Sequence, residues 1–265
     1  MKKNFNYLYG PVDSWRLGSS LGIDLLSWSS KVCSFDCCYC QLGRTTTFTT
    51  ERRLYVPTED ILKEIDTLPD IKIDYLTFSG IGEPTLARNL GEAILAVSRI
   101  RSEPVAVFTN ASLMSREDVR KDLLSAHFVI AKLDACSQSS LEAVNRPAPE
   151  IDYDEIVEGL KQFRADFTGK MALQIMFVRA NRDLPGEIAR VAREIRPDEV
   201  QINTPLRPCE DVPLSREIIS EIKSFFKGLN FVSVYDDAVK SRTEPISNKH
   251  TMRRRGKFLG GACKT

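Results

Sequence analysis

The stretch Cys33-Ser34-Phe35-Asp36-Cys37-Cys38-Tyr39-Cys40 carries the strongest structural signal in this chain of 265 residues. Three of its cysteines follow the spacing Cys-x3-Cys-x2-Cys, with an aromatic residue directly before the last one. Cysteine thiolates are the ligands of iron–sulfur clusters, and three of them leave one iron of a cubane cluster open to another ligand. Cys33, Cys37 and Cys40 therefore indicate a cluster with one position open for chemistry.

Other uses of these cysteines fit the sequence less well. A structural zinc site takes four closed ligands, and this stretch has neither a histidine nor a distant Cys-x2-Cys partner. Disulfides suit small secreted domains, whereas residues 4–14 hold no continuous apolar segment typical of a signal peptide. No apolar run approaches the length of a membrane span. We therefore expect a cytoplasmic protein with reduced thiols and no membrane partner.

The charge of the chain is unevenly distributed. Residues 238–265 contain eight Lys or Arg and one acid, Glu244, which makes +7, so the other 237 residues carry −6 of the net +1. The composition, 42% apolar and 28% charged, is typical of a globular protein with one large core. We predict one domain over residues 1–237 and a basic tail over 238–265. Such a tail either binds a phosphate-rich partner such as RNA or is a solvated chain terminus.

Apolar, β-rich runs alternate with segments of helical period about six times. The predicted strands are Gly22–Leu26, Tyr75–Phe78, Val105–Phe108, Phe128–Leu133, Met171–Val178 and Glu199–Asn203. Helical stripes lie within residues 58–68, 90–97, 153–167, 188–195 and 218–226, and Thr58 is the expected N-cap of the first. This alternation predicts right-handed βαβ units and a parallel sheet, either open or curled into a barrel or partial barrel.

Unusual polar residues follow the ends of these strands. Because ligands gather at the carboxyl ends of parallel strands, we expect these residues to converge on one rim. They are the cysteine loop, Ser79–Pro84, Thr109 and Asn110, Asp134, and Asn203–Pro205.

The loop Gly80-Ile81-Gly82-Glu83-Pro84 suits close approach of the backbone to a ligand. Its glycines remove side chains, Pro84 stiffens the exit, and Glu83 supplies a carboxylate. It could hydrogen-bond an ammonium group or be an ordinary turn between strand and helix. It is not a dinucleotide fingerprint, because Thr85 stands where the third glycine is required.

Together, the cysteine loop after the first strand and the glycine loop after the second resemble the radical S-adenosylmethionine (radical SAM) superfamily. The resemblance implies a partial (β/α)6-type barrel of parallel strands with outer helices. It also implies a [4Fe–4S] cluster on Cys33, Cys37 and Cys40, with S-adenosylmethionine chelating the open iron. The implied cofactor-binding residues are Tyr39 at the adenine, Gly80, Gly82, Glu83 and Pro84 at the methionine ammonium, and Asn110 and Asp134 at the ribose or methionine.

The chain is most similar to an iron–sulfur oxidoreductase-like subgroup, many of whose members are archaeal, over roughly residues 7 to 210. This resemblance implies an enzyme in which an electron from a low-potential donor cleaves S-adenosylmethionine. The resulting 5′-deoxyadenosyl radical then removes hydrogen from a substrate. The resemblance does not identify the substrate. It could be RNA, which the basic tail favours, or a protein partner, or a small metabolite. A non-catalytic electron carrier or redox sensor is the alternative.

The remaining cysteines have no assigned ligand role. Cys38 is expected to pack inward or stay a free thiol, while Cys136, Cys209 and Cys263 could hold a second cluster, bind substrate, resolve a thiyl intermediate or be incidental. Arg146 and Arg179 are expected to pair with carboxylates on the rim or elsewhere in the structure.

Overall fold

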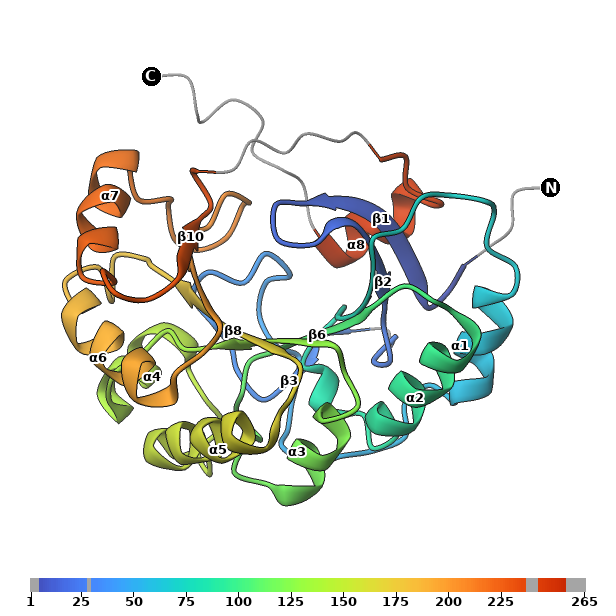
Figure 1. The fold of residues 1–265 in the computed structure, drawn as a ribbon, viewed down its shortest axis with the longest axis horizontal. Helices are drawn as coiled ribbons and strands as arrows, with labels where there is room; N and C mark the ends of the chain where they lie inside the picture. The colour runs from blue at the N-terminus through green and yellow to red at the C-terminus, as the bar shows by residue number, and fades with distance from the viewer. Residues whose placement is uncertain (1–4, 28–29, 237–242, 256–265) are drawn as a thin grey trace.

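The computed structural model describes residues 5–27, 30–236 and 243–255 of the chain. Its main sheet has eight strands in the order β1-β2-β5-β6-β7-β8-β9-β10 and curls into a half-barrel with helices outside (Figure 1). Strand β1 is antiparallel to β2, and all other neighbours are parallel. The predicted partial barrel is therefore confirmed. The strands are β1 Leu8–Ser14, β2 Gly18–Ile23, β5 Tyr75–Phe78, β6 Val105–Thr109, β7 Phe128–Lys132, β8 Lys170–Met176, β9 Glu199–Asn203 and β10 Phe231–Ser233.

All six predicted strands are present, four of them with shifted ends, and the largest shift is in the first. Strand β2 begins at Gly18 and ends at Ile23, whereas the prediction ran from Gly22 to Leu26. Ser20 lay outside the predicted strand, but its hydroxyl lies 2.7 Å from the Thr77 hydroxyl on β5, inside the sheet. The edge strands β1 and β10 were not predicted.

Helices follow the parallel strands and cover the outer face of the sheet (Figure 1). All five predicted stripes lie on helices, whereas α3, α4 and α8 were not predicted. Helix α1 starts at Thr58, but Pro57 holds the cap position, so the predicted Thr58 cap is wrong. The Thr58 hydroxyl instead accepts a hydrogen bond from Asn89 Nδ2 at 3.1 Å. The helices are α1 Thr58–Ile65, α2 Leu90–Ile100, α3 Glu117–Leu123, α4 Gln138–Asn145, α5 Tyr153–Asp166, α6 Pro185–Ile195, α7 Arg216–Ser224 and α8 Asn248–Arg255.

The two faces of the sheet have different chemistry because side chains alternate along each strand. Outward residues such as Val129, Leu173 and Ile202 join the main core under the helices. Inward residues form a smaller apolar cluster, to which Phe128, Ile130 and Ala172 belong. Polar residues on this inner face, including Gln174 and Gln201, line what we call the lumen of the half-barrel.

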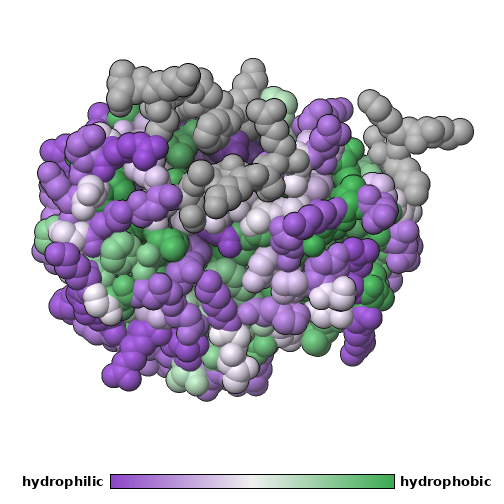
Figure 2. All heavy atoms as spheres, turned by 45° about the horizontal axis from the view of Figure 1, so that its top comes forward, coloured by the Kyte–Doolittle hydropathy of each residue, from purple (hydrophilic) through white to green (hydrophobic). Residues whose placement is uncertain are grey.

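The face turned toward the viewer in Figure 2 is mostly hydrophilic, with hydrophobic side chains in small separate groups. Large exposed hydrophobic residues such as Leu95, Val212 and Phe225 lie in different parts of the chain. No helix in the described part of the chain is both long and apolar enough to span a membrane.

The described part of the predicted basic tail packs on the domain. The Ile246 amide donates to the Gly10 carbonyl on β1 at 2.5 Å, and the Gly10 amide donates to Thr251 Oγ1 at 3.0 Å. Residues 248–255 form α8 beside β1 (Figure 1). Since an unpaired edge strand exposes backbone groups, this segment protects one edge of the sheet. The boundary at residue 238 stays a prediction.

Candidate functional site

The cysteine loop and the glycine loop are joined through their backbones. The Val32 amide donates to the Ile81 carbonyl at 3.2 Å, and the Glu83 amide donates to the Val32 carbonyl at 3.1 Å. Gly82 has a φ of +138°, and a Cβ there would lie 1.6 Å from the Val32 carbonyl oxygen. Only glycine fits this close approach. The two motifs that the sequence separates by about forty residues therefore form one unit.

Short backbone bonds shape the cysteine loop itself. The Cys40 amide donates to the Cys37 carbonyl, and the Gly43 amide donates to the Cys40 carbonyl, each at 3.0 Å. The Cys38 amide donates to Val144 at the end of α4, also at 3.0 Å. This turn holds the Cys37 and Cys40 positions close together, with Cys33 at the end of the short strand β3, Val32–Cys33, which pairs with β4, Thr47–Phe48.

Two asparagine amides from other elements face the cysteine sulfurs. Asn145 Nδ2, on α4, lies 3.4 Å from Cys37 Sγ, and Asn110 Nδ2, after β6, lies 3.6 Å from Cys33 Sγ. Hydrogen bonds to the ligand sulfurs are one means by which a protein adjusts the potential of an iron–sulfur cluster. The predicted site residue Asn110 therefore lies against the cysteine loop.

A buried lysine adds positive charge beside the same cysteines. Lys31 is 6% exposed, and its Nζ donates to the Gly43 carbonyl at 2.9 Å. Burial by itself lowers the Lys31 pKa. The nearby Cys40, Cys33 and Cys37 thiolates together raise it by a larger amount, so the net pKa is raised. The ammonium group thus stays charged and favours thiolates in this loop.

The thiols themselves resist ionisation in the absence of a metal. Burial, with the neighbouring Cys40 thiolate, raises the pKa of Cys37 to about 11, and burial and Cys37 raise that of Cys33. All six cysteines in the described ranges are free of disulfides. Bound iron stabilises thiolates, so metal binding would displace these protons.

Tyr39 and Asp134 lie in one buried network. The Tyr39 hydroxyl donates to Asp134 Oδ2, and Asn145 Nδ2 lies 2.8 Å from the same oxygen. The other Asp134 oxygen accepts from the Met176 amide at 2.7 Å and lies 3.2 Å from Lys132 Nζ. Burial and the Asp134 charge raise the Tyr39 pKa, which keeps its hydroxyl protonated as a donor. The end of β7 is therefore held directly against the cysteine loop.

Glu83 is buried at 2% exposure and already surrounded by donors. Its carboxylate accepts from the Thr85 amide and hydroxyl at 3.1 and 2.7 Å, from Thr109 Oγ1 at 2.7 Å and from the Asn110 amide at 2.6 Å. These bonds tie the glycine loop to the end of β6. Ammonium binding by Gly80, Gly82, Glu83 and Pro84 stays a prediction.

The donor set fits an iron–sulfur cluster better than a single ion. Within residues 5–27, 30–236 and 243–255, no three His, Cys, Asp or Glu side chains converge on one point as a single metal ion requires. A cluster instead takes each thiolate on a different iron. The buried Asn145 Oδ1 atom, beside Cys37, has no hydrogen-bond partner among the described residues. The free thiols, the facing amides and this acceptor fit a cluster and a polar ligand.

The other cysteines divide by position. Cys38 is buried, as expected, and packs with Tyr39, Val144 and Val178, with the half-buried Cys209 against them. Cys136 lies elsewhere, with Ser140 Oγ 3.9 Å from its sulfur. Cys263 is outside the described residues, so a second cluster stays a prediction.

The rim arginines pair with carboxylates, as expected. Arg146 Nη1 lies 2.9 Å from Glu210, and Arg179 Nε lies 2.8 Å from Asp211. These ion pairs connect the end of α4 and the loop after β8 to the loop after β9.

Comparison with known proteins decides the family. The Radical SAM superfamily profile matches residues 29–181, more than half of the chain. The chain belongs to the radical SAM superfamily. It is 38% identical to UPF0026 protein slr1464 of Synechocystis sp. over 82% of this chain and 81% of that protein. It is 39% identical to UPF0026 protein MJ1312 of Methanocaldococcus jannaschii over 82% of this chain and 70% of that one.

A protein of known structure has the same fold. Streptococcus suis SuiB bound to S-adenosylmethionine superposes with a TM-score of 0.60 at 16% identity, over 77% of this chain and 48% of the SuiB chain. This chain therefore spans about half the length of SuiB. The partial barrel is therefore a fold that this chain shares with SuiB.

Three residues of the site were missed by sequence reasoning. Asn145 and Lys132 have no motif around them, and each meets the cysteine loop only through folding. Lys31 lies two residues before Cys33 in the sequence, and folding buries its side chain beside the cysteines. The Lys132 ammonium lies 4.8 Å from the centroid of the Tyr39 ring. For Lys132, its place near the end of a predicted strand was the one available signal of a position at the site.

Proposed function

We propose that this chain is a radical SAM enzyme that uses Cys33, Cys37 and Cys40 to hold a [4Fe–4S] cluster. Such a cluster would hold S-adenosylmethionine and pass one electron to it, which would cleave it to methionine and a 5′-deoxyadenosyl radical able to abstract hydrogen from a substrate. The observation that carries the proposal is the backbone pairing of Val32 with Gly82, which joins the two family motifs. A simple electron carrier has no use for the second motif.

The residues of the chain would prepare this chemistry in three ways. Asn110 and Asn145 would donate to the cluster sulfurs, and Lys31 would offset the negative charge of the reduced cluster. Asp134 would hold the Tyr39 hydroxyl and so orient the ring, which would border the adenine. The curled sheet would shield the radical from water and hold the target hydrogen near it.

The substrate is proposed only as a molecule that enters the lumen. RNA, a protein partner and a small metabolite all stay predictions. Arg254, one of the basic residues that favoured RNA, is 2% exposed and unavailable to such a partner.

The test is the formation of 5′-deoxyadenosine by anaerobically reconstituted, dithionite-reduced protein. We expect product from the wild type and from Cys38→Ala, and none from Cys37→Ala. Cys38 is the matched control because it is an adjacent buried thiol without a ligand role. Equal product from Cys37→Ala, or an electron paramagnetic resonance spectrum unchanged by S-adenosylmethionine, would contradict the proposal, and the latter would favour an electron carrier.

A further inference from the structure

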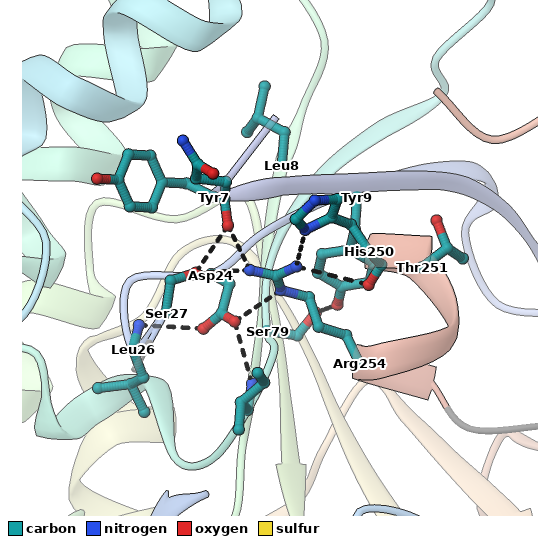
Figure 3. A network of polar contacts seen from close by, with 12 residues as sticks. Tyr7, Leu8, Tyr9, Asp24, Leu26, Ser27, Ser79, His250, Thr251 and Arg254 are labelled. Carbon is teal, nitrogen blue, oxygen red and sulfur yellow. Dashed lines mark hydrogen bonds and ion pairs between the residues drawn. The ribbon is translucent and has the colours of Figure 1, made fainter. Parts of the chain in front are cut away.

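Helix α8 is anchored by the side chain of Arg254 (Figure 3). Arg254 Nε donates to Asp24 Oδ2 at 2.7 Å, and Nη2 donates to the Asn6 carbonyl and to Ser27 Oγ, each at 2.6 Å. The Arg254 and Asp24 side chains are 0% and 2% exposed. A guanidinium with this many buried partners fixes the C-terminal end of α8 against the end of β2.

This anchor places α8 on the lumen side of the sheet. A Cβ on Gly22 would lie 2.1 Å from the Tyr9 ring, so that ring covers the inner face of β2 at this position. Gly22 shares its face with Ser20, opposite the core residue Leu21. The Arg254 guanidinium lies 5.4 Å from the Tyr9 ring centroid, on this same inner side.

The next residue, Arg255, lines a pocket with an arginine from the other side of the lumen. This pocket has a volume of about 210 Å³ and is lined by β1, by Arg207 after β9, and by the C-terminal segment that includes Arg255. Ligand pockets usually measure roughly 300–1,000 Å³. The space therefore suits one chemical group of a larger molecule.

Positive charge is concentrated around this pocket. Burial and the Arg255 charge lower the pKa of Arg16 to about 9 and that of Arg207 to about 10, so both stay charged near neutral pH. Burial also lowers the pKa of Arg255. Asp13, the one carboxylate lining the pocket in the described part of the chain, accepts hydrogen bonds from Thr243. Two arginines and one carboxylate thus line the pocket in the described part of the chain.

Arg16 extends the cationic region into the lumen. The Gln174 amide, with its oxygen toward Arg16, accepts from Nη2 at 2.6 Å and from Nε at 2.9 Å. The guanidinium lies 5.5 Å from the Phe108 ring centroid. No carboxylate of the described residues forms an ion pair with Arg16 or Arg255 within 4.0 Å. Like charges held together in a poorly hydrated site favour a bound anion.

We propose that this pocket binds a phosphate or carboxylate group of the substrate between Arg207 and Arg255, with α8 as one wall of the site. The planar guanidinium fork matches both groups and can bind them through two parallel hydrogen bonds. The proposal rests on the proposed function, because it identifies the substrate of that enzyme as an anion. It also gives the buried Arg254 anchor a purpose, which is to hold Arg255 at the lumen.

Anion binding to the cluster-loaded protein tests this. Inorganic phosphate and acetate are titrated separately by calorimetry at constant ionic strength, and the two titrations distinguish phosphate from carboxylate. We expect saturable one-to-one binding of at least one probe, weakened about tenfold or more in Arg255→Gln and in Arg207→Gln. Lys249→Gln removes the same charge from an exposed position on α8 and should bind as the wild type does.

Three results would overturn the proposal. They are no saturable binding of either probe, an equal loss in Lys249→Gln, and loss of S-adenosylmethionine affinity in Arg255→Gln. The last result would assign the arginines to the cofactor. Failure of the proposed function would appear separately, as absent 5′-deoxyadenosine with phosphate or acetate binding intact.

Discussion

Arg254 and Asp24 lie 230 positions apart in the chain and form a buried ion pair of 2.7 Å. Asp24 also accepts from the Leu26 amide at 3.0 Å and from the Ile81 amide at 3.3 Å. One carboxylate therefore connects the C-terminal helix to the start of the cysteine loop and to the glycine loop. The stability of α8 and the geometry of the cofactor site are linked through it.

We expect Arg254→Gln to lower the free energy of unfolding by about 3–5 kcal/mol, because it leaves the Asp24 charge buried without its partner. Lys249→Gln, an exposed change on the same helix, should stay within about 0.5 kcal/mol. The measurement is urea unfolding. The Arg254→Gln/Asp24→Asn double variant should recover part of the loss, and fully additive effects would show that the pair is not coupled.

Substitutions at Gly82 and Gly43 provide a matched pair of variants that tests the contact between the glycine loop and the cysteine loop. Both have positive φ, but a Cβ at Gly82 would collide with Val32, whereas nothing lies within 4 Å of one at Gly43. We expect Gly82→Ala to prevent cluster incorporation or to cost more than about 3 kcal/mol, and Gly43→Ala to cost roughly 1 kcal/mol. Iron content and urea unfolding measure these effects. Equal losses in both variants would remove the special role of the Val32 contact.

Lys31 should raise the reduction potential of the cluster, because its positive charge favours the more negative reduced state. We expect Lys31→Gln to lower the midpoint potential by about 50–100 mV, which corresponds to roughly 1–2 kcal/mol of charge–charge interaction at an effective dielectric constant of about 20. Anaerobic redox titration followed by electron paramagnetic resonance gives the value. The exposed change Lys63→Gln should leave it unchanged, and an unchanged potential in Lys31→Gln would refute this role.

The raised pKa of Cys37 predicts slow alkylation of the metal-free protein. Thiolate is the reactive form, so below a pKa of about 11 the rate should rise about tenfold per pH unit from about pH 7 to 9.5. Free cysteine, with a pKa of about 8.5, should level off within this range. Iodoacetamide labelling with mass spectrometry measures the Cys37 rate. A plateau near pH 8 would show that its pKa is not raised.

Local sequence patterns predicted most of the barrel. The runs that became β5, β6, β7, β8 and β9 have the length and composition of buried parallel strands, and the helical stripes have the period of one covered face. The cysteine spacing likewise indicated a cluster, because its ligands lie within eight residues of each other. These features are properties of short segments, so they can be read without knowledge of the fold.

The edges of the sheet and the contacts of the site were less predictable. Strand β1 forms by pairing with β2, and β10 is only three residues long, so neither has a strong pattern of its own. Asn145 contacts Cys37 across 108 positions of sequence. No local period records such a contact.

The sequence by itself determined the cluster motif, the glycine loop and the alternation of strands and helices, because each depends on residues close together in the chain. The tertiary structure alone decided the roles of the basic residues near the C-terminus. Arg253 is exposed while Arg254 beside it is fully buried. Identical side chains differ here because burial of a charge depends on a distant partner, Asp24, which only folding supplies.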